Sequence, residues 1–117
     1  MCAIFGIIGK TDKALINKIS SLQLFRGPDS QETYINEEKN FCLGNNRLAV
    51  IDKEGGKQPM FSQDKKSIVV FNGVIYNFKE IREYLKKKGI SFSTDSDTEV
   101  VANSYMHWGK KMFNYFD

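Results

Sequence analysis

Residues 1–9 read MCAIFGIIG, a short apolar run punctuated by glycine. This pattern predicts a buried β-strand from Cys2 to Gly9. A free cysteine in such a strand is most often a small buried hydrophobic residue. The position of Cys2 supports a second interpretation, because removal of Met1 would place a thiol and a free α-amino group on the same residue.

The α-amino group and the thiol of an N-terminal cysteine are well matched for proton transfer. Their ordinary pKa values are about 7.7–8.0 and about 8.5. The amine can therefore take the thiol proton near neutral pH, directly or through one water, so that Cys2 acts as nucleophile beside its own base. The single histidine, His107, is expected to be a surface or packing residue. A chain that keeps Met1 would lack this base and is expected to be inactive.

The rest of the sequence predicts a mixture of helices and strands, which is the α+β class. Helices are expected where apolar residues recur at helical spacing: residues 12–24, residues 77–88 before Gly89, and residues 96–108. Strands are expected at residues 31–35, 41–51 and 67–71, with a further short strand between the last two helices. Helix starts are predicted from an Asp12 N-cap and from capping boxes at Asn77–Glu80 and Ser96–Glu99.

The composition excludes several classes of function. The formal charge of +3, from 17 Lys and Arg against 14 Asp and Glu, is too small to indicate a nucleic-acid partner. No apolar run is long enough to span a membrane. Cys2 and Cys42 are too few for a disulfide framework and lack metal-ligand spacing, so we expect a cytoplasmic protein without a metal site.

Asn72-Gly73 follows the clearest β-run of the sequence. Such a pair is common in tight hairpin turns, which is one interpretation. It could instead stabilise an oxyanion, because the asparagine amide and the next backbone N–H both donate hydrogen bonds and glycine admits a close approach. The residues alone do not decide between these alternatives.

Arg47 and Asp97 are the two charged candidates for a binding site. Arg47 lies in an otherwise strand-like segment, where it could hold a carboxylate through two hydrogen bonds or form an internal salt bridge. Asp97 lies in the first turn of a predicted helix, where it could cap the helix or accept an ammonium group. Together the two charges would suit a free amino acid.

Six stretches in this order resemble the class II, N-terminal-nucleophile glutamine amidotransferase domain, in the branch of the glutamine-hydrolysing asparagine synthetases. They are MC-IFGI at 1–7, RGPDS at 26–30, LG--RL--ID at 43–52, QPM at 58–60, NG-IYN at 72–77 and SDTE at 96–99. The resemblance implies an αββα sandwich over residues 1–117. It further implies that L-glutamine is hydrolysed to L-glutamate and ammonia through a thioester on Cys2.

The resemblance also implies a role for each site position. Cys2 would be the nucleophile, and Asn72 and Gly73 would form the oxyanion hole. Arg47 would hold the α-carboxylate of glutamine, and Asp97 would hold its α-amino group. The remaining pocket positions it implies are Leu48, Val50, Ile51 and Val74. Val74 stands where asparagine synthetases carry a glutamate, Ala3 where glycine or serine is commoner, and Phe25 where a histidine is frequent.

The family continues beyond the length of this chain. Residues 112–117 carry no cap or polar tail, so we expect the N-terminal part of a longer protein with exposed sheet edges that favour a homodimer. The resemblance implies a C-terminal synthetase domain, using ATP and Mg²⁺ for asparagine biosynthesis, as the partner that receives the ammonia; no cofactor is expected in this chain. The alternative is a non-catalytic remnant that only folds or self-associates, which Val74 favours.

Overall fold

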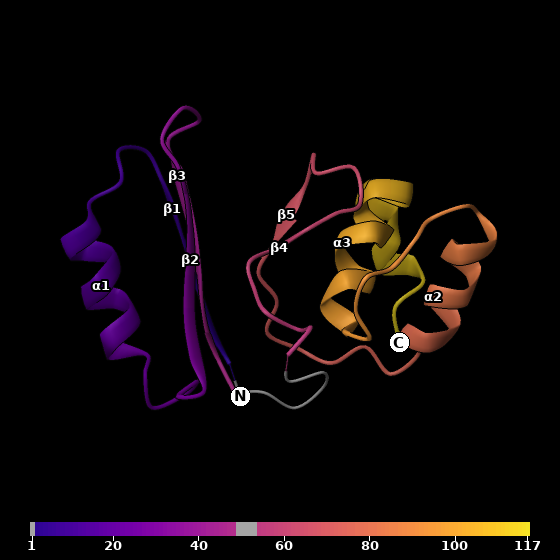
Figure 1. Ribbon diagram of the computed structural model, residues 1–117, viewed down its shortest axis with the longest axis horizontal. Helices are drawn as coiled ribbons and strands as arrows, with labels where there is room; N and C mark the ends of the chain where they lie inside the picture. The colour runs from indigo at the N-terminus through magenta and orange to yellow at the C-terminus, as the bar shows by residue number, and fades with distance from the viewer. Residues whose placement is uncertain (1, 49–53) are drawn as a thin grey trace.

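The computed structural model describes residues 2–48 and 54–117 of the chain. In chain order its elements are β1 (Ala3–Ile8), α1 (Lys13–Leu22), β2 (Ser30–Asn36), β3 (Phe41–Arg47), β4 (Met60–Phe61), β5 (Ile68–Val69), α2 (Phe78–Lys87), α3 (Asp97–Trp108) and the 3₁₀-helix η1 (Gly109–Asn114). Figure 1 shows them in layers: α1, the sheet of β1, β2 and β3, the β4–β5 pair, α3, and α2 on the far side. This architecture confirms the α+β prediction.

β3 is the central strand of the first sheet, and β1 and β2 lie antiparallel on either side of it. Ala3 of β1 pairs with Asn46, and Ser30 of β2 pairs with Arg47. Paired residues of antiparallel strands lie about 4.5–5.5 Å apart. The register therefore places Cys2, which precedes β1, beside the end of β3.

α1 begins as the sequence predicts, because the Asp12 side chain caps it by accepting a hydrogen bond from the Ala14 N–H at 2.8 Å. Ser20 fixes the helix to the first sheet. Its hydroxyl donates to Asn46 Oδ1 at 2.9 Å, and its carbonyl accepts from Asn46 Nδ2 at 2.7 Å. This double contact holds β3 one residue before Arg47.

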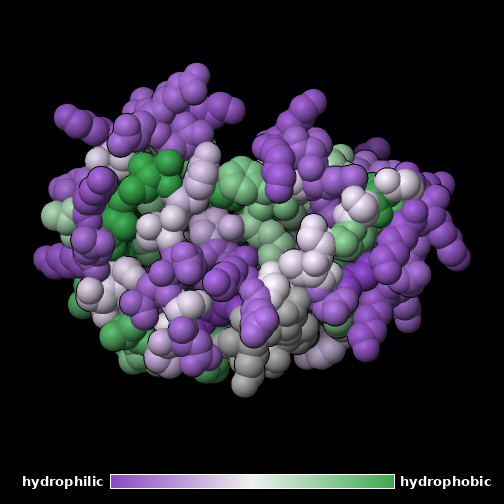
Figure 2. All heavy atoms as spheres, viewed as in Figure 1, coloured by the Kyte–Doolittle hydropathy of each residue, from purple (hydrophilic) through white to green (hydrophobic). Residues whose placement is uncertain are grey.

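The second half of the chain has its own apolar core beneath α3. The core residues come from the segment before α2, from α2, α3 and η1, and from the loop between α2 and α3: Ile75, Ile81, Leu85, Ile90, Val100, Val101 and Met112. The two sheets meet through Tyr34 and Phe61, whose rings pack edge to face with centroids 5.2 Å apart. Figure 2 shows apolar side chains over the sheets in the upper middle of this face, with hydrophilic side chains around them.

The strand predicted at residues 67–71 is shorter in the structure, where only Ile68–Val69 pairs with β4. β4 itself has only two residues, so within residues 2–48 and 54–117 the later residues of the β-run have no ladder partner. In the first sheet, the strand predicted at 41–51 ends at Arg47 in the described part of the chain, and residues 49–51 lie outside it.

The predicted capping box at the start of α2 is wrong. The Asn77 side chain makes no capping hydrogen bond; its Nδ2 donates to the Tyr115 carbonyl at 2.8 Å, and its Oδ1 accepts from the Asp117 N–H at 3.0 Å. The Tyr76 N–H also donates to the Asp117 carbonyl at 2.7 Å. Contacts with residues 115–117, distant in sequence, therefore replace the local cap.

Of the capping box predicted at the start of α3, the Ser96 cap is confirmed and the reciprocal Glu99 bond is wrong. Ser96 caps the helix, accepting from the Thr98 N–H at 3.0 Å. Glu99 does not reach back to Ser96; its carboxylate accepts from the backbone N–H groups of Ser93 and Thr94 at 2.8 and 2.7 Å. These bonds hold residues 93–94 in an irregular loop, so the short strand predicted between α2 and α3 is also wrong.

Among the described residues, no helix is both long and apolar enough to cross a lipid bilayer.

Candidate functional site

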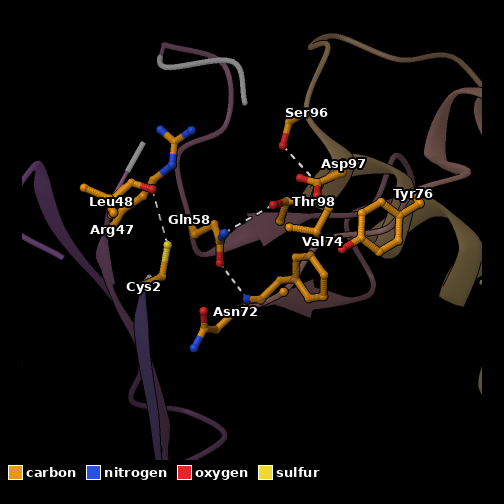
Figure 3. Close-up of a pocket in the computed structure, with 12 residues that line it drawn as sticks. Cys2, Arg47, Leu48, Gln58, Asn72, Val74, Tyr76, Ser96, Asp97 and Thr98 are labelled. Carbon is orange, nitrogen blue, oxygen red and sulfur yellow. Dashed lines mark hydrogen bonds between the residues drawn. The ribbon is translucent and has the colours of Figure 1, made fainter. Parts of the chain in front are cut away.

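A pocket of about 410 Å³ lies between the end of the first sheet and the N-terminus of α3 (Figure 3). Its lining residues come from segments far apart in the sequence: Cys2, Arg47, Leu48, Gln58, Phe71, Asn72, Gly73, Val74, Tyr76, Ser96, Asp97 and Thr98. All the site residues expected from the sequence that fall in the described part of the chain line this pocket. Val50 and Ile51, also expected there, lie outside the described residues, as does Met1.

Cys2 is half-buried at one side of the pocket, and its thiol donates to the Leu48 carbonyl at 3.6 Å. It is therefore not the fully buried apolar cysteine of the alternative interpretation. Cys42 has that role instead: it is completely buried within β3, and burial raises the pKa of its thiol. A raised pKa lowers the thiolate fraction at neutral pH, so the Cys42 thiol is both inaccessible and unreactive.

Arg47 and Asp97 bring one positive and one negative charge to the pocket, and only 5% and 7% of their surfaces are exposed. Burial raises the pKa of the Asp97 carboxyl. Hydrogen bonds from the backbone of Thr98 and Ile75 and the charge of Arg47 act in the opposite direction.

The raised pKa of Asp97 means that burial disfavours its ionised carboxylate, and a bound ligand can offset this free-energy cost. Because the folded protein holds this proton more tightly, its stability decreases as the pH rises from the ordinary pKa of Asp to the raised pKa. A ligand cation beside the carboxylate would compensate the lost solvation. The site is thus suited to a ligand that carries an ammonium group.

Asn72 and Gly73 lie in the segment between β5 and α2 and do not form a hairpin turn. Neither has the positive φ that a type I′ turn requires, and the chain continues into α2 instead of returning along β5. A Cβ on Gly73 would lie 2.9 Å from the Phe71 ring, which also lines the pocket. A side chain here would therefore force that ring to shift.

Sequence reasoning missed several lining residues: Gln58, Phe71, Tyr76, Ser96 and Thr98. Ser96 and Thr98 flank Asp97 on the N-terminal turn of α3, so their positions follow from its own. Gln58 belongs to the QPM stretch, which is one of the six that resemble the family but contains no position to which the resemblance assigns a role. Its contacts to Phe71 and Thr98 are long-range, and no local pattern indicates them.

The turn at Arg26–Asp29 supports the end of β3 through its glycine. A Cβ on Gly27 would lie 2.0 Å from the Asn46 carbonyl oxygen and 2.5 Å from the Arg47 nitrogen. The Asp29 N–H donates to the Arg47 carbonyl at 3.0 Å. Since no side chain fits at 27, this turn and the backbone of Arg47 are held in direct contact.

Replacing Gly27 with alanine is therefore expected to destabilise the fold by about 2 kcal/mol or more, because rigid backbone must move. Gly6→Ala is the matched control, since its Cβ would meet the flexible Leu43 side chain at 3.3 Å and the Cys42 carbonyl oxygen at an ordinary van der Waals distance of 3.8 Å. Chemical denaturation of both variants measures the difference. Equal free energies of unfolding would mean that the contact at Gly27 is not constrained.

Comparison with known proteins gives one family model, described as a glutamine amidotransferase domain, which matches residues 1–117. Among relatives, asparagine synthetase [glutamine-hydrolyzing] 1 of Bacillus subtilis (strain 168) is 40% identical over 92% of this chain and 18% of its own length. Asparagine synthetase [glutamine-hydrolyzing] 1 of Arabidopsis thaliana is 38% identical over the whole chain and 20% of its own length.

The chain thus spans about a fifth of the length of these relatives. The family model confirms the glutamine amidotransferase type to which the sequence motifs pointed, and the relatives are named as glutamine-hydrolysing asparagine synthetases, the branch that the motifs resemble. The family match extends over every segment that contributes to the pocket. On this match, the chain belongs to the glutamine amidotransferase domain family.

Proposed function

We propose that this chain hydrolyses L-glutamine to L-glutamate and ammonia, with Cys2 as the nucleophile once Met1 has been removed. One observation carries the proposal. Cys2, Arg47, the pair Asn72-Gly73 and Asp97 lie on four separate segments, and all of them line a single pocket. A thiol, hydrogen-bond donors and two opposite charges together are what hydrolysis of an amino-acid amide requires.

The reaction follows from these groups. The freed α-amino group takes the Cys2 thiol proton, and the sulfur attacks the side-chain amide carbon of glutamine. The negative charge that develops on the amide oxygen is stabilised by the Asn72 side-chain amide and the Gly73 N–H. The amine returns its proton to the departing nitrogen, ammonia leaves, and a water molecule then hydrolyses the thioester to glutamate.

The same pocket would orient the substrate. The Arg47 guanidinium binds the α-carboxylate, and the Asp97 carboxylate binds the α-ammonium group. Leu48 contributes to the wall of the pocket. Val50 and Ile51, for which the resemblance implies the same role, lie outside the described residues. A zwitterion matches this pair of charges, whereas a simple amide offers neither charge and would lose both interactions.

At the level of the whole protein, we propose that residues 1–117 are the glutaminase part of a longer synthetase. Ammonia would pass to a synthetase domain, in keeping with the names of the relatives, and that domain would use ATP and Mg²⁺. The layer order of α1, two sheets, and α3 with α2 supports the αββα sandwich of N-terminal-nucleophile enzymes. A reducing cytoplasm would keep both cysteines as thiols, and unpaired strand edges would allow a homodimer.

Val74 is the feature that favours a non-catalytic remnant. It is about half exposed and lines the pocket without contributing a charge. Arg47 and Asp97 still supply one charge of each sign for the zwitterion. We therefore expect weaker glutamine binding than in relatives with an acid here, but not loss of the reaction.

Val74→Glu is expected to tighten glutamine binding by about fivefold, because a second carboxylate beside the ammonium adds about 1 kcal/mol of attraction. Titration calorimetry of the turnover-deficient Cys2→Ala protein measures the dissociation constant. Glutaramic acid, which is glutamine without its α-amino group, is the control ligand and should gain nothing. Equal gains for both ligands would show that position 74 does not face the ammonium group.

Labelling with a diazoketone analogue of glutamine tests the proposed function. Intact mass first establishes that Met1 is absent, and peptide mapping then locates the adduct. We expect alkylation of Cys2, none of the buried Cys42, and protection by excess glutamine. A processed, folded protein that remains unlabelled would support the non-catalytic alternative.

A further inference from the structure

The Gln58 side chain forms a bridge across the floor of the pocket. Only 5% of the residue is exposed. Its Oε1 accepts a hydrogen bond from the Phe71 N–H at 2.6 Å, and its Nε2 donates to Thr98 Oγ1 at 3.2 Å. Figure 3 shows the carboxamide between Cys2 and Leu48 on one side and Asp97 and Thr98 on the other.

The two ends of this bridge adjoin the two halves of the proposed site. Phe71 directly precedes Asn72 and Gly73, which supply the oxyanion donors. Thr98 directly follows Asp97, which accepts the ammonium group. One buried carboxamide therefore connects the segment that stabilises the reacting end of glutamine with the segment that binds its other end.

Among the residues that the structure describes, no strand pairs with the segment that contains Phe71. β5 ends at Val69, two residues earlier, and the chain has no regular structure from there to α2. A buried backbone N–H without an acceptor destabilises the fold. The hydrogen bond from the Phe71 N–H to Gln58 thus fixes backbone that lies beyond the end of β5 and has no β-pairing of its own.

We propose that Gln58 is a positioning residue, which sets the distance between the oxyanion donors at Asn72–Gly73 and the ammonium acceptor Asp97. This inference rests on the proposed glutaminase reaction and assigns Gln58 no contact with the reacting atoms. The donors of an oxyanion hole must match the transition state closely. Complete loss of one donor lowers kcat by about 10²–10³-fold. Partial displacement should have a smaller effect of the same kind.

Gln58→Met tests the proposal, since methionine has a similar length but makes neither hydrogen bond. Gln63→Met is the matched control: Gln63 also bonds through both ends, to the Ser91 hydroxyl at 2.9 Å and from the Ser91 N–H at 3.3 Å, but it does not line the pocket. In the intact, processed protein we expect Gln58→Met to lower kcat by about 10–100-fold and to raise KM, with cooperative unfolding retained. Gln63→Met should change neither parameter by more than about twofold.

Amide hydrogen exchange gives a readout that does not need activity. Gln58→Met should accelerate exchange at Phe71 by about tenfold or more, because its N–H loses its acceptor. The same measurement on Gln63→Met should leave Phe71 unchanged. Equal exchange at Phe71 in all three proteins, or equal kcat in Gln58→Met and the parent, would overturn the positioning role.

Thr98→Val covers the case in which Gln58→Met does not fold. It removes only the bond next to Asp97 and leaves the bond to Phe71, so KM should rise by about fivefold or more with kcat nearly constant. An unchanged KM would contradict the proposal. Absence of glutaminase activity in the parent protein would refute the proposed function instead, while the exchange rates at Phe71 would still test the bridge.

Discussion

Cys2→Ala is expected to lower kcat for glutamine hydrolysis by about 10⁴-fold or more, because no other group in the pocket can form the thioester. Cys42→Ala is the matched control, since this second thiol is fully buried and does not line the pocket. Ammonia release measures the rate, and calorimetry should show that Cys2→Ala still binds glutamine. Hydrolysis that survives in Cys2→Ala would exclude the thioester route.

Retention of Met1 should lower glutaminase activity strongly, as loss of the Cys2 thiol does. When Met1 is retained, the nitrogen of Cys2 belongs to a peptide bond and cannot accept a proton. We therefore expect protein that keeps Met1 to be nearly inactive although Cys2 is present. Full activity in such protein would point to a different general base.

Arg47→Ala should raise KM for glutamine by about 100-fold, with a much smaller change in kcat. A charge-assisted, two-pronged hydrogen bond to a carboxylate in a buried site contributes about 1.5–3 kcal/mol or more, and its loss weakens ground state and transition state alike. Only 5% of Arg47 is exposed, so water compensates little. Steady-state kinetics measures both constants, and a thermal melt checks the fold.

Two comparisons separate substrate binding from a structural role of Arg47. Arg47→Lys keeps the charge but loses the planar fork, so it should recover only part of the affinity. The decarboxylated amide, 4-aminobutanamide, has no carboxylate, and its weak hydrolysis should not depend on Arg47. An unchanged KM for glutamine in Arg47→Ala would mean that the residue forms only an internal ion pair.

Local sequence signals predicted the elements whose ends depend on near neighbours. Asp12 and Ser96 cap their helices because a short polar side chain reaches the N–H groups of the first turn. Gly89 ends α2 with a φ of 87°, which glycine adopts without strain. These outcomes depend only on neighbouring residues, so a single sequence is sufficient to predict them.

Long-range partners account for the predictions that were wrong. Asn77 matches a capping pattern, but its amide satisfies backbone groups of residues 115–117. Glu99 occupies the position in the capping box from which its side chain could bond back to the Ser96 N–H, but its carboxylate accepts from the N–H groups of Ser93 and Thr94 instead. In both cases the side chain has the capacity to cap, and only the packed structure decides which N–H group it meets.

The candidate site shows the same division. Family motifs pointed to Cys2, Arg47 and Asp97 by position, and the register of β1 against β3 explains why the first two lie together. Gln58 had no such signal, because its role depends on segments 13 and 40 residues away. Sequence reasoning could not identify residues that hold a site together through long-range hydrogen bonds of a side-chain amide.

Trapping the covalent intermediate tests the central claim most directly. Protein with and without Met1 is mixed with glutamine, quenched in acid within the first turnover, and measured by intact mass spectrometry. We predict a mass increase of one glutamyl acyl group, located on Cys2, only in the protein whose N-terminal residue is Cys2. An adduct on Cys2 in the Met1-retaining protein, or ammonia release by processed protein without any adduct, would contradict the claim that the thiol and its own α-amino group act together.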